Sequence, residues 1–483
     1  MEQKKVIAYQ QELFGINGKD AICHSLSCKG VPEASWAKAL QVDEAGKQGQ
    51  ALVYNLMEVV CGGHNILTAY KQVKRNKGVG GTDGMRVEEF SAWYRVNGIV
   101  LLESLLSGTY QPQTVRHVEI PKPNGGTRKL GVPTVIDRVI QQAISQVLTP
   151  IYKAGFSDHS YGFRPNRSAH QALQKAGGYV ENGRTIVVDM DLKNFFDVVN
   201  HDRLMYLLST RIGDKGLLKL IRKYLQSGIM LEGIVSQRTE GTPQGSPLSP
   251  LLSNIVLDEL DKELERRGHC FVRYADDCNI FVRSQEAGER IMSSLCSFIE
   301  NKLKLKVNPD KSKVCEVMES KFLGYTILNN GMLVVSKQAL LRLKQNVREV
   351  TKRNRGVSLE RIIVELNQKL RGWLNYFRYA KCHKLVRNLD AWIRRKLRCY
   401  RIKQCKRVYT LQQFLHKQGV EKWQSWILAL SGKGLWRKSG CPQASQAMGK
   451  DWFTKLKLYN LTLNYETLNN LQKPPCTKVR TVV

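Results

Sequence analysis

The chain has 483 residues and a hydrophobic content of 42%, which is enough for roughly two to four compact units with real cores. It carries 75 Lys and Arg against 42 Asp and Glu, and the resulting net charge of +33 attracts polyanions, chiefly nucleic acid or an anionic membrane. No apolar run approaches the length of a membrane span, and the amino-terminal residues lack the apolar core of a signal peptide. We therefore expect nucleic acid, and no membrane, as the partner.

The twelve cysteines are not spaced like metal ligands, because CxxC occurs nowhere. The closest pair, Cys23 and Cys28, has only His24 beside it. We expect free thiols in a reducing cytoplasm and no structural zinc.

Residues 1–51 match no recognised pattern. The first element that the sequence predicts is a helix over Val53–Asn76. The sequence KPNGGTR follows, a Gly-Gly turn between two predicted strands. Such a turn can fold Lys122 and Arg128 over a triphosphate, the lysine as a point charge and the arginine as a fork.

The next acidic signal follows a predicted buried strand. The run Thr185–Val188 is β-branched and apolar, and Asp189 and Asp191 come after it at alternate positions. Strand geometry puts these two aspartates on one face. The pattern matters because a two-metal phosphoryl-transfer site needs carboxylates from separate strands that converge on one point.

A second acidic signal lies in FVRYADDCNIFV, residues 271–282. Two runs of strand composition with four residues between them predict a β-hairpin with Asp276 and Asp277 at its tip. Neighbouring anions repel each other unless a cation lies beside them, and a hard divalent metal is the usual cation. A solvated turn explains the same stretch, because Asp is common in turns. With Asp191, the pair would supply a metal site.

The charge is concentrated between Lys337 and Arg407, where 22 Lys and Arg stand against 4 Asp and Glu, an excess of 18. Aromatic residues such as Trp373 and Trp392 interleave these cations, and the apolar residues recur at helical spacing. We predict a basic helical bundle that binds phosphates. A solvated helical face is the alternative, although such faces usually mix both signs of charge.

Together these motifs resemble the reverse transcriptases encoded by group II introns, over about residues 52–405. YADD, DLKNFFD and TPQGSPLSPLLSNIVLDELD resemble the palm of these enzymes. Further family motifs occur in the family's order: NKGVGGTDGM, VEIPKPNGGTRKLGVPTVIDRVIQQAI, DHSYGFRPNRSAHQAL, LKLKVNPDKSKV, FLGYTI and RGWLNYFRY.

The resemblance implies an α+β fold shaped as a right-hand polymerase, with mixed fingers, an antiparallel palm sheet backed by helices and a helical thumb. Five regions follow from it: an extension of unknown role, an N-terminal clamp with fingers, the palm with the catalytic site, the thumb or maturase domain, and a small C-terminal DNA-binding region. Their expected bounds are 1–51, 52–185, 186–335, 336–407 and 408–483.

By the same resemblance, two Mg²⁺ ions and a deoxynucleotide would bind in the palm. The expected metal-binding and catalytic residues are Asp191, Asp276 and Asp277. The expected nucleotide-binding residues are Lys122, Arg128, Phe196, Gln244 and Lys311. Phe196 would lie beneath the incoming sugar and reject a 2′-hydroxyl, with a core position as the alternative. Lys311 would neutralise or protonate pyrophosphate, with a plain surface lysine as the alternative.

Two aspartates and one phenylalanine near the site are expected to have other roles. Asp189 and Asp197 are not expected to ligate metal; Asp189 lies one pleat short and should make a local hydrogen bond. Phe195 is the expected core residue.

Nucleic-acid contacts are expected at two places. Arg164 and Arg167 lie in a polar segment before a helix, as a loop that grips template or primer phosphates would. In the thumb, we expect contacts from Arg394, Arg395 and Lys396. Residues 411–483 contain one histidine and two cysteines, too few for the endonuclease module of many relatives, so we expect DNA binding there without strand cleavage.

The resemblance implies an RNA-directed DNA polymerase that also acts as a maturase, binding its intron RNA for splicing and then copying it into DNA at a DNA target. Two alternatives stay open. One is a splicing factor with a vestigial polymerase. The other is a related bacterial reverse transcriptase that serves defence, CRISPR spacer acquisition or diversity generation.

Overall fold

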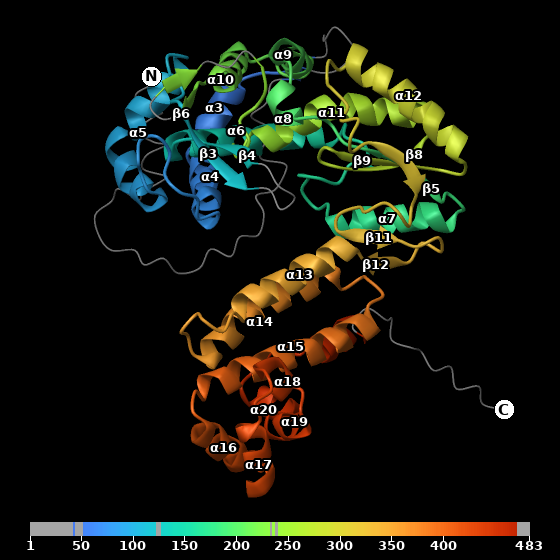
Figure 1. Cartoon of the computed structure of the whole chain (residues 1–483). Coiled ribbons are helices and arrows are strands. Elements are labelled where there is room, and N and C mark those ends of the chain that lie inside the picture. Colours follow the sequence, from blue (N-terminus) through green and yellow to red (C-terminus); the bar gives the residue numbers. More distant parts are fainter. Residues whose placement is uncertain (1–41, 44–51, 122–126, 232–233, 237–239, 471–483) are drawn as a thin grey trace, which may run out of the picture. The chain divides into compact units, whose positions relative to one another are not determined.

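The computed structural model describes five stretches of the chain (Figure 1), residues 42–43, 52–121, 127–231, 234–236 and 240–470. Lys122 and the Cys23–Cys28 pair lie outside the described residues, so their predictions stay untested. Within the described ranges, no helix has the length and apolar character that crossing a membrane requires.

The chain forms two compact units. The first contains the chain up to Ala172 together with Ile186–Cys315, and the second contains Leu173–Thr185 together with the chain from Glu316 onward. Both units combine helices with antiparallel strands, which confirms the predicted α+β class.

A four-stranded sheet in the first unit carries the acidic motifs, and we call it the aspartate sheet. β5 and β8 each pair with β9 in antiparallel register. Side chains such as Val188 and Ile280 are fully buried, as β-branched residues on a covered sheet should be. Helices α11 (Ser249–Arg266) and α12 (Gln285–Asn301) pack against the sheet. In the order β10-β5-β9-β8, its strands are Lys313–Glu316, Ile186–Met190, Asp277–Val282 and Cys270–Tyr274.

A second four-stranded sheet comes mostly before it in the chain. Strands β3 (Val115–Pro121) and β4 (Thr127–Val132) pair antiparallel and flank residues 122–126, as the Gly-Gly turn predicted. β3 also pairs with β6 (Ile229–Leu231), here in parallel, and β6 pairs with β7 (Ile234–Ser236).

The remaining helices of the first unit pack into one core with the aspartate sheet. The predicted helix over Val53–Asn76 is present as two helices, because Gly62 separates α3 from α4. α6 begins after Thr134, whose hydroxyl accepts a hydrogen bond from the Asp137 amide (3.2 Å) as an N-cap. The helices are α3 (Leu56–Cys61), α4 (Gly63–Arg75), α5 (Phe90–Leu106), α6 (Val135–Lys153), α8 (Phe195–Val198), α9 (His201–Ser209) and α10 (Lys215–Gln226).

The second unit begins with most of α7 (Ala169–Glu181) and a hairpin of β11 (Tyr325–Ile327) and β12 (Leu333–Val335). The predicted basic bundle follows, and its helices are confirmed: α13 (Lys337–Val350), α14 (Leu359–Phe377) and α15 (His383–Gln404). Ser336 and Ser358 cap α13 and α14 by accepting hydrogen bonds from amides in the first turn.

Six short helices follow in the part of the second unit that the structure describes. The carboxylate of Asp390 on α15 accepts hydrogen bonds from the backbone amides of Leu461 (3.0 Å) and Thr462 (2.8 Å), which fastens the start of α21 to the bundle. The six helices are α16 (Val408–Lys417), α17 (Lys422–Leu430), α18 (Leu435–Lys438), α19 (Pro442–Ala447), α20 (Lys450–Lys455) and α21 (Leu461–Asn470).

Candidate active site

The hairpin predicted around the paired aspartates is present, with a tighter turn than expected. Tyr274 at the end of β8 pairs directly with Asp277 at the start of β9, so only Ala275 and Asp276 form the loop. Ala275 has a positive φ of 58°, a left-handed conformation that costs an L-residue about 1–2 kcal/mol. Asp276 therefore lies in a strained two-residue turn, and Asp277 is the first strand residue after it.

Gly162 packs directly against this turn. A Cβ atom at Gly162 would lie 2.2 Å from the backbone nitrogen of Ala275, closer than any real contact. The segment around Gly162 also joins the hairpin edge, since the Tyr161 amide donates to the Arg273 carbonyl (2.9 Å). Only glycine fits at this point, so the turn is supported from outside by backbone.

Asp191 lies directly after β5, and a loop near 308–312 holds it. The Asn308 amide side chain donates to Asp191 Oδ1 (3.1 Å), and Lys311 Nζ lies 3.3 Å from Oδ2. The backbone amide of Asp191 donates to Ser312 Oγ (3.0 Å). The carboxylate is thus oriented from a segment more than a hundred residues away in sequence.

All three predicted metal-binding aspartates line one cleft of 830 Å³ in the first unit, which we call the aspartate cleft. Asp191 follows the last residue of β5, and β5 lies beside β9 in the sheet. This neighbouring position brings Asp191 close to the tip of the β8–β9 hairpin. Other predicted site residues that line the same cleft are Phe196, Gln244 and Lys311.

The aspartates interact electrostatically. Loss of surrounding water in the cleft, followed by repulsion from Asp276, Asp189 and Asp191, raises the pKa of Asp277 to about 7, although its carboxylate still contacts solvent. Lys311 opposes this shift. A carboxyl group with a raised pKa among other carboxylates marks a place where negative charge is incompletely balanced.

Asp189 makes the local interaction expected of it. It lies opposite Asn279 in the β5–β9 register, and with the side-chain amide of Asn279 assigned so that its nitrogen faces Asp189, that nitrogen donates to Asp189 Oδ1 (3.1 Å).

Phe195 and Phe196 occupy different surroundings in α8. Phe195 is 2% exposed and belongs to the core, whereas Phe196 is half-buried. Their rings contact edge to face, with centroids 5.3 Å apart. The buried ring of Phe195 therefore packs against the ring of Phe196, which lines the aspartate cleft.

The backbone of Gln244 is tied to the neighbouring sheet. The Gly131 amide of β4 donates to the Gln244 carbonyl (2.7 Å), and a Cβ atom on Gly245, whose φ is +109°, would lie 2.8 Å from the Gly131 carbonyl oxygen. Gly245 thus permits this close approach. Arg128 lies in β4, opposite Ile120 of β3, but its side chain is not described.

The cleft fits a divalent cation by charge, and Lys311 already brings one ammonium group to Asp191. In the described part of the chain, however, no three His, Cys, Asp or Glu side chains are grouped closely enough to enclose a metal. Mg²⁺ typically takes one or two carboxylates and completes its shell with water and substrate phosphates. The aspartates therefore suit a metal that arrives with a phosphate-bearing substrate.

The predicted template-binding arginines make contacts within their own segment. Arg164 donates to the carbonyl oxygens of Ser157 and Ser160 and lies over the ring of Phe156 at 5.4 Å. Arg167 pairs with Asp158. Both side chains hold the loop in place, and any contact with phosphate would add to that role.

The predicted thumb contacts lie beside α18. The guanidinium of Arg395 stacks on Trp436 at 4.2 Å, and its Nη2 donates to the Trp436 carbonyl (3.2 Å). Lys396 lies 5.0 Å from the same ring. Two of the three predicted residues therefore also anchor α18, which the sequence did not indicate; Arg394 stays half-buried.

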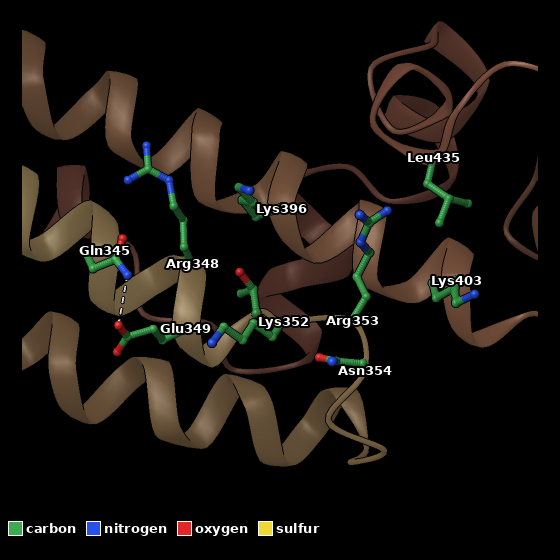
Figure 2. Close-up of a pocket in the computed structure, with 10 residues that line it drawn as sticks. Gln345, Arg348, Glu349, Lys352, Arg353, Asn354, Lys396, Lys403 and Leu435 are labelled. Atoms are coloured by element: carbon green, nitrogen blue, oxygen red, sulfur yellow. Dashed lines mark hydrogen bonds between the residues drawn. The ribbon is translucent and has the colours of Figure 1, made fainter.

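Lys396 also borders a second cavity of 740 Å³ in the second unit, which we call the basic pocket (Figure 2). Among its described lining residues, Glu349 alone carries a carboxylate, which accepts a hydrogen bond from Gln345 (2.9 Å). Burial, followed by repulsion from Arg348 and Arg353, lowers the pKa of Lys396. The cations that line the pocket are Arg348, Lys352, Arg353, Lys396 and Lys403.

Three residues that shape the aspartate cleft were not predicted from the sequence: Asn308, Ser312 and Arg273. Asn308 and Ser312 belong to the motif LKLKVNPDKSKV, in which the prediction covers Lys311 alone. Arg273 has the place of an ordinary strand residue next to YADD, yet its guanidinium is buried and hydrogen-bonded to the turn. A charged residue inside an otherwise apolar strand is the signal that could have indicated this role.

Comparison with known proteins gives two family matches. Residues 120–327 match the model for reverse transcriptase (RNA-dependent DNA polymerase). Residues 340–419 match the model for the group II intron maturase-specific domain.

Three curated relatives are similar to large parts of the chain. Protein YkfC of Escherichia coli (strain K12) is 32% identical over 323 residues, covering 59% of this chain and 84% of that protein. Group II intron-encoded protein LtrA of Lactococcus lactis subsp. cremoris is 32% identical over 325 residues, covering 54% of each. A COX1/OXI3 intron 2 protein of Saccharomyces cerevisiae is 29% identical over 323 residues, covering 54% of this chain and 37% of that protein. The chain thus spans about half of the length of LtrA.

Proposed function

Because the chain belongs to the family of group II intron reverse transcriptases with a maturase-specific domain, we propose that its aspartate cleft extends a primer along an intron RNA template. The chain carries an RNA-directed DNA polymerase domain, and nucleic acid is its partner. Divalent metal ions and deoxynucleotides are general requirements of this family. The observation that carries the proposal is the meeting of Asp191, Asp276 and Asp277 in one cleft.

In this proposal the three aspartates hold two Mg²⁺ ions. When bound, such ions activate a primer 3′-hydroxyl and neutralise the leaving pyrophosphate. Asp191 is oriented for this role by Asn308. Lys311, now 3.3 Å from Asp191, would transfer its interaction to the triphosphate and neutralise or protonate the leaving group.

The other cleft residues would position the nucleotide. Phe196 lines the cleft, where its ring would lie beneath the incoming sugar and reject a 2′-hydroxyl, and Gln244 lines the same cleft next to Gly245. Lys122 and Arg128, at the two ends of the sequence KPNGGTR, would grip the triphosphate. These roles follow the family pattern and rest on the chemistry of each side chain.

The proposed regional roles follow the same family pattern: fingers before the aspartate sheet, a palm around it, then a thumb and a DNA-binding region. The basic pocket supports a role for the thumb in RNA binding, since five cations line it beside the carboxylate of Glu349. Phosphate groups are the anions that such a pocket attracts most strongly. Cysteines such as Cys61 and Cys278 form no disulfide, as thiols in the proposed reducing cytoplasm would not.

Intron splicing and mobility are the favoured biological role. Two relatives, LtrA and the yeast protein, are named as intron proteins, which supports this role over defence, CRISPR spacer acquisition or diversity generation. A vestigial polymerase is disfavoured because nothing physical would preserve mutually repelling acids in a cleft without a cation to bind.

Primer extension tests the proposal. Purified protein receives an RNA template, a DNA primer, deoxynucleotides and Mg²⁺, beside the double variant Asp276→Ala, Asp277→Ala. A control double variant, Asp202→Ala with Asp451→Ala, removes the same charge from exposed positions. We expect extension by wild type and control only. Wild-type extension no faster than that of the cleft variant would refute the polymerase proposal.

A further inference from the structure

Arg273, two residues before the turn of the YADD hairpin, has a fully buried side chain. Its side chain is 1% exposed, and its partner Asp261 on α11 is completely buried. Nε and Nη2 donate to the two carboxylate oxygens of Asp261 at 2.7 and 2.5 Å, a fork-to-fork ion pair. A buried pair of this kind is held with little freedom.

The rest of the guanidinium is also fully used. Nη1 donates to Asn254 Oδ1 (3.1 Å) and to the carbonyl oxygen of Ala275 (2.8 Å), and Nη2 donates to Ser160 Oγ (2.8 Å). An arginine has five N–H donors in a fixed plane, and five hydrogen bonds are made here. Lysine could not reach this set of acceptors from a single ammonium group.

The bond to Ala275 controls where the acid that follows can lie. The Ala275 carbonyl and the Asp276 amide form one rigid peptide plane. Fixing that oxygen therefore fixes the plane from which Asp276 starts, in a turn whose left-handed Ala275 would otherwise relax. Gly162 closes the other side, and its own carbonyl accepts a bond from Asn254 (2.9 Å).

We propose that Arg273 is a positioning residue that, clamped by Asp261, holds the YADD turn in the geometry by which its aspartates bind divalent metal. The inference rests on the proposed polymerase function and adds a residue that acts through Asp276 and Asp277. Core stability alone is a poor reason for this ion pair, because buried pairs can often be replaced by apolar residues without loss of stability.

The charge-conserving variant Arg273→Lys tests this directly. Its control is Arg203→Lys, which removes a similar arginine fork from Glu259 on the same helix, α11, away from the turn. Three quantities are measured: the melting temperature, the affinity for Mn²⁺ by electron paramagnetic resonance of the free ion, and kcat with the half-saturating Mg²⁺ concentration in primer extension. Affinity for template and primer serves as the check that nucleic-acid binding persists.

We expect Arg273→Lys to lower kcat about tenfold or more and to weaken Mn²⁺ binding several-fold, with unchanged template affinity, because displacing reacting groups by about 1 Å can cost roughly a hundredfold in rate. Arg203→Lys should leave both values near wild type. A purely structural Arg273 would lower the melting temperature while leaving Mn²⁺ affinity and kcat within about twofold of the control, and this result would overturn the inference.

A second variant covers the case in which Arg273→Lys does not fold. The double variant Arg273→Gln, Asp261→Asn keeps the net charge, leaves no unpaired buried ion and removes the bond to Ala275. The same loss of Mn²⁺ affinity supports the inference, and wild-type affinity refutes it. Mn²⁺ binding needs no turnover, so this result is distinct from failure of the polymerase proposal, which appears as absent extension by wild type.

Discussion

At the scale of single residues, Phe195 and Phe196 show what local sequence can and cannot determine. Adjacent positions on a short helix point in different directions, so one ring is buried and the other borders the aspartate cleft. The resemblance to the family predicted that Phe195 is the core residue and that Phe196 lies beside the nucleotide. Composition alone could not, since both residues are equally apolar.

Phe196→Ala should admit ribonucleotides. Removal of the ring opens space for a 2′-hydroxyl, and we expect the ratio of kcat/KM for ribonucleotide over deoxynucleotide to rise roughly tenfold or more. Single-nucleotide primer extension measures it.

Phe195→Leu is the matched control for Phe196→Ala. This change in the core should lower the melting temperature while leaving sugar selectivity as in wild type. A selectivity ratio that stays at the wild-type value in Phe196→Ala would remove the sugar-gate role.

Asp277 predicts a dependence of stability on pH. Its pKa is raised from 3.8 to about 7 in the folded chain, so the folded state keeps a proton that the unfolded state releases. Stability from this group is therefore lost as the pH rises from about 4 to about 7. Asp277→Asn lacks the effect.

We measure the melting temperature of Asp277→Asn and subtract that of wild type. This difference should increase between about pH 5 and pH 7. Bound Mg²⁺ should make the increase smaller. Scanning fluorimetry at several pH values, with and without the metal, measures this difference. A difference that does not change with pH would show that burial and the neighbouring carboxylates do not raise the pKa of Asp277.

At the scale of elements, strand composition and helical periodicity predicted the main local structures but not the two-residue turn of the hairpin or the break at Gly62. They predicted the hairpin around YADD, the strand before Asp191 and the basic helices α13 to α15. They could not predict that Asn308 orients Asp191, since no local pattern encodes a contact over such a sequence distance. Nor could they show that Arg395 is stacked on Trp436.

The basic pocket is the sharper test of RNA binding in the second unit, because changing Arg395 or Lys396 would also disturb α18. Arg348 and Lys352 line the pocket and are exposed. In the double variant Arg348→Ala, Lys352→Ala we expect weaker RNA binding. The slope of log Kd against log salt concentration should also decrease, by about 0.7 to 0.9 for each phosphate that the variant no longer neutralises.

The control for this variant is Lys215→Ala, Lys219→Ala, which removes the same charge from α10 in the first unit. Filter binding at several salt concentrations gives the slopes. If the slope for the pocket variant equals that of wild type, the pocket does not bind phosphate.

The triple variant Arg394→Ala, Arg395→Ala, Lys396→Ala should weaken RNA binding and also lower the melting temperature. The loss of stability follows from the removal of two cations from Trp436. Calorimetry beside filter binding separates the two effects; an unchanged melting temperature would mean that the stacking contributes nothing measurable.

At the scale of the whole molecule, the net charge of +33 and the order of motifs indicated a nucleic-acid enzyme, and the reverse transcriptase and maturase matches agree. Charge does not identify which RNA is bound, because phosphates are alike along every RNA. We expect the chain to co-purify with one structured intron RNA and to speed its splicing at low Mg²⁺. Sequencing of the bound RNA, followed by a splicing assay with and without protein, measures both; recovery of only bulk cellular RNA would contradict the maturase role.

In the proposed function, Asp191, Asp276 and Asp277 share divalent ions. A structure determined with template, primer, a non-hydrolysable deoxynucleotide and Mn²⁺ would test it by the anomalous signal of the metal. We predict two peaks about 4 Å apart, bridged by Asp191 and by at least one aspartate of the turn. Metal peaks away from these carboxylates, or carboxyl groups more than roughly 10 Å apart, would contradict it.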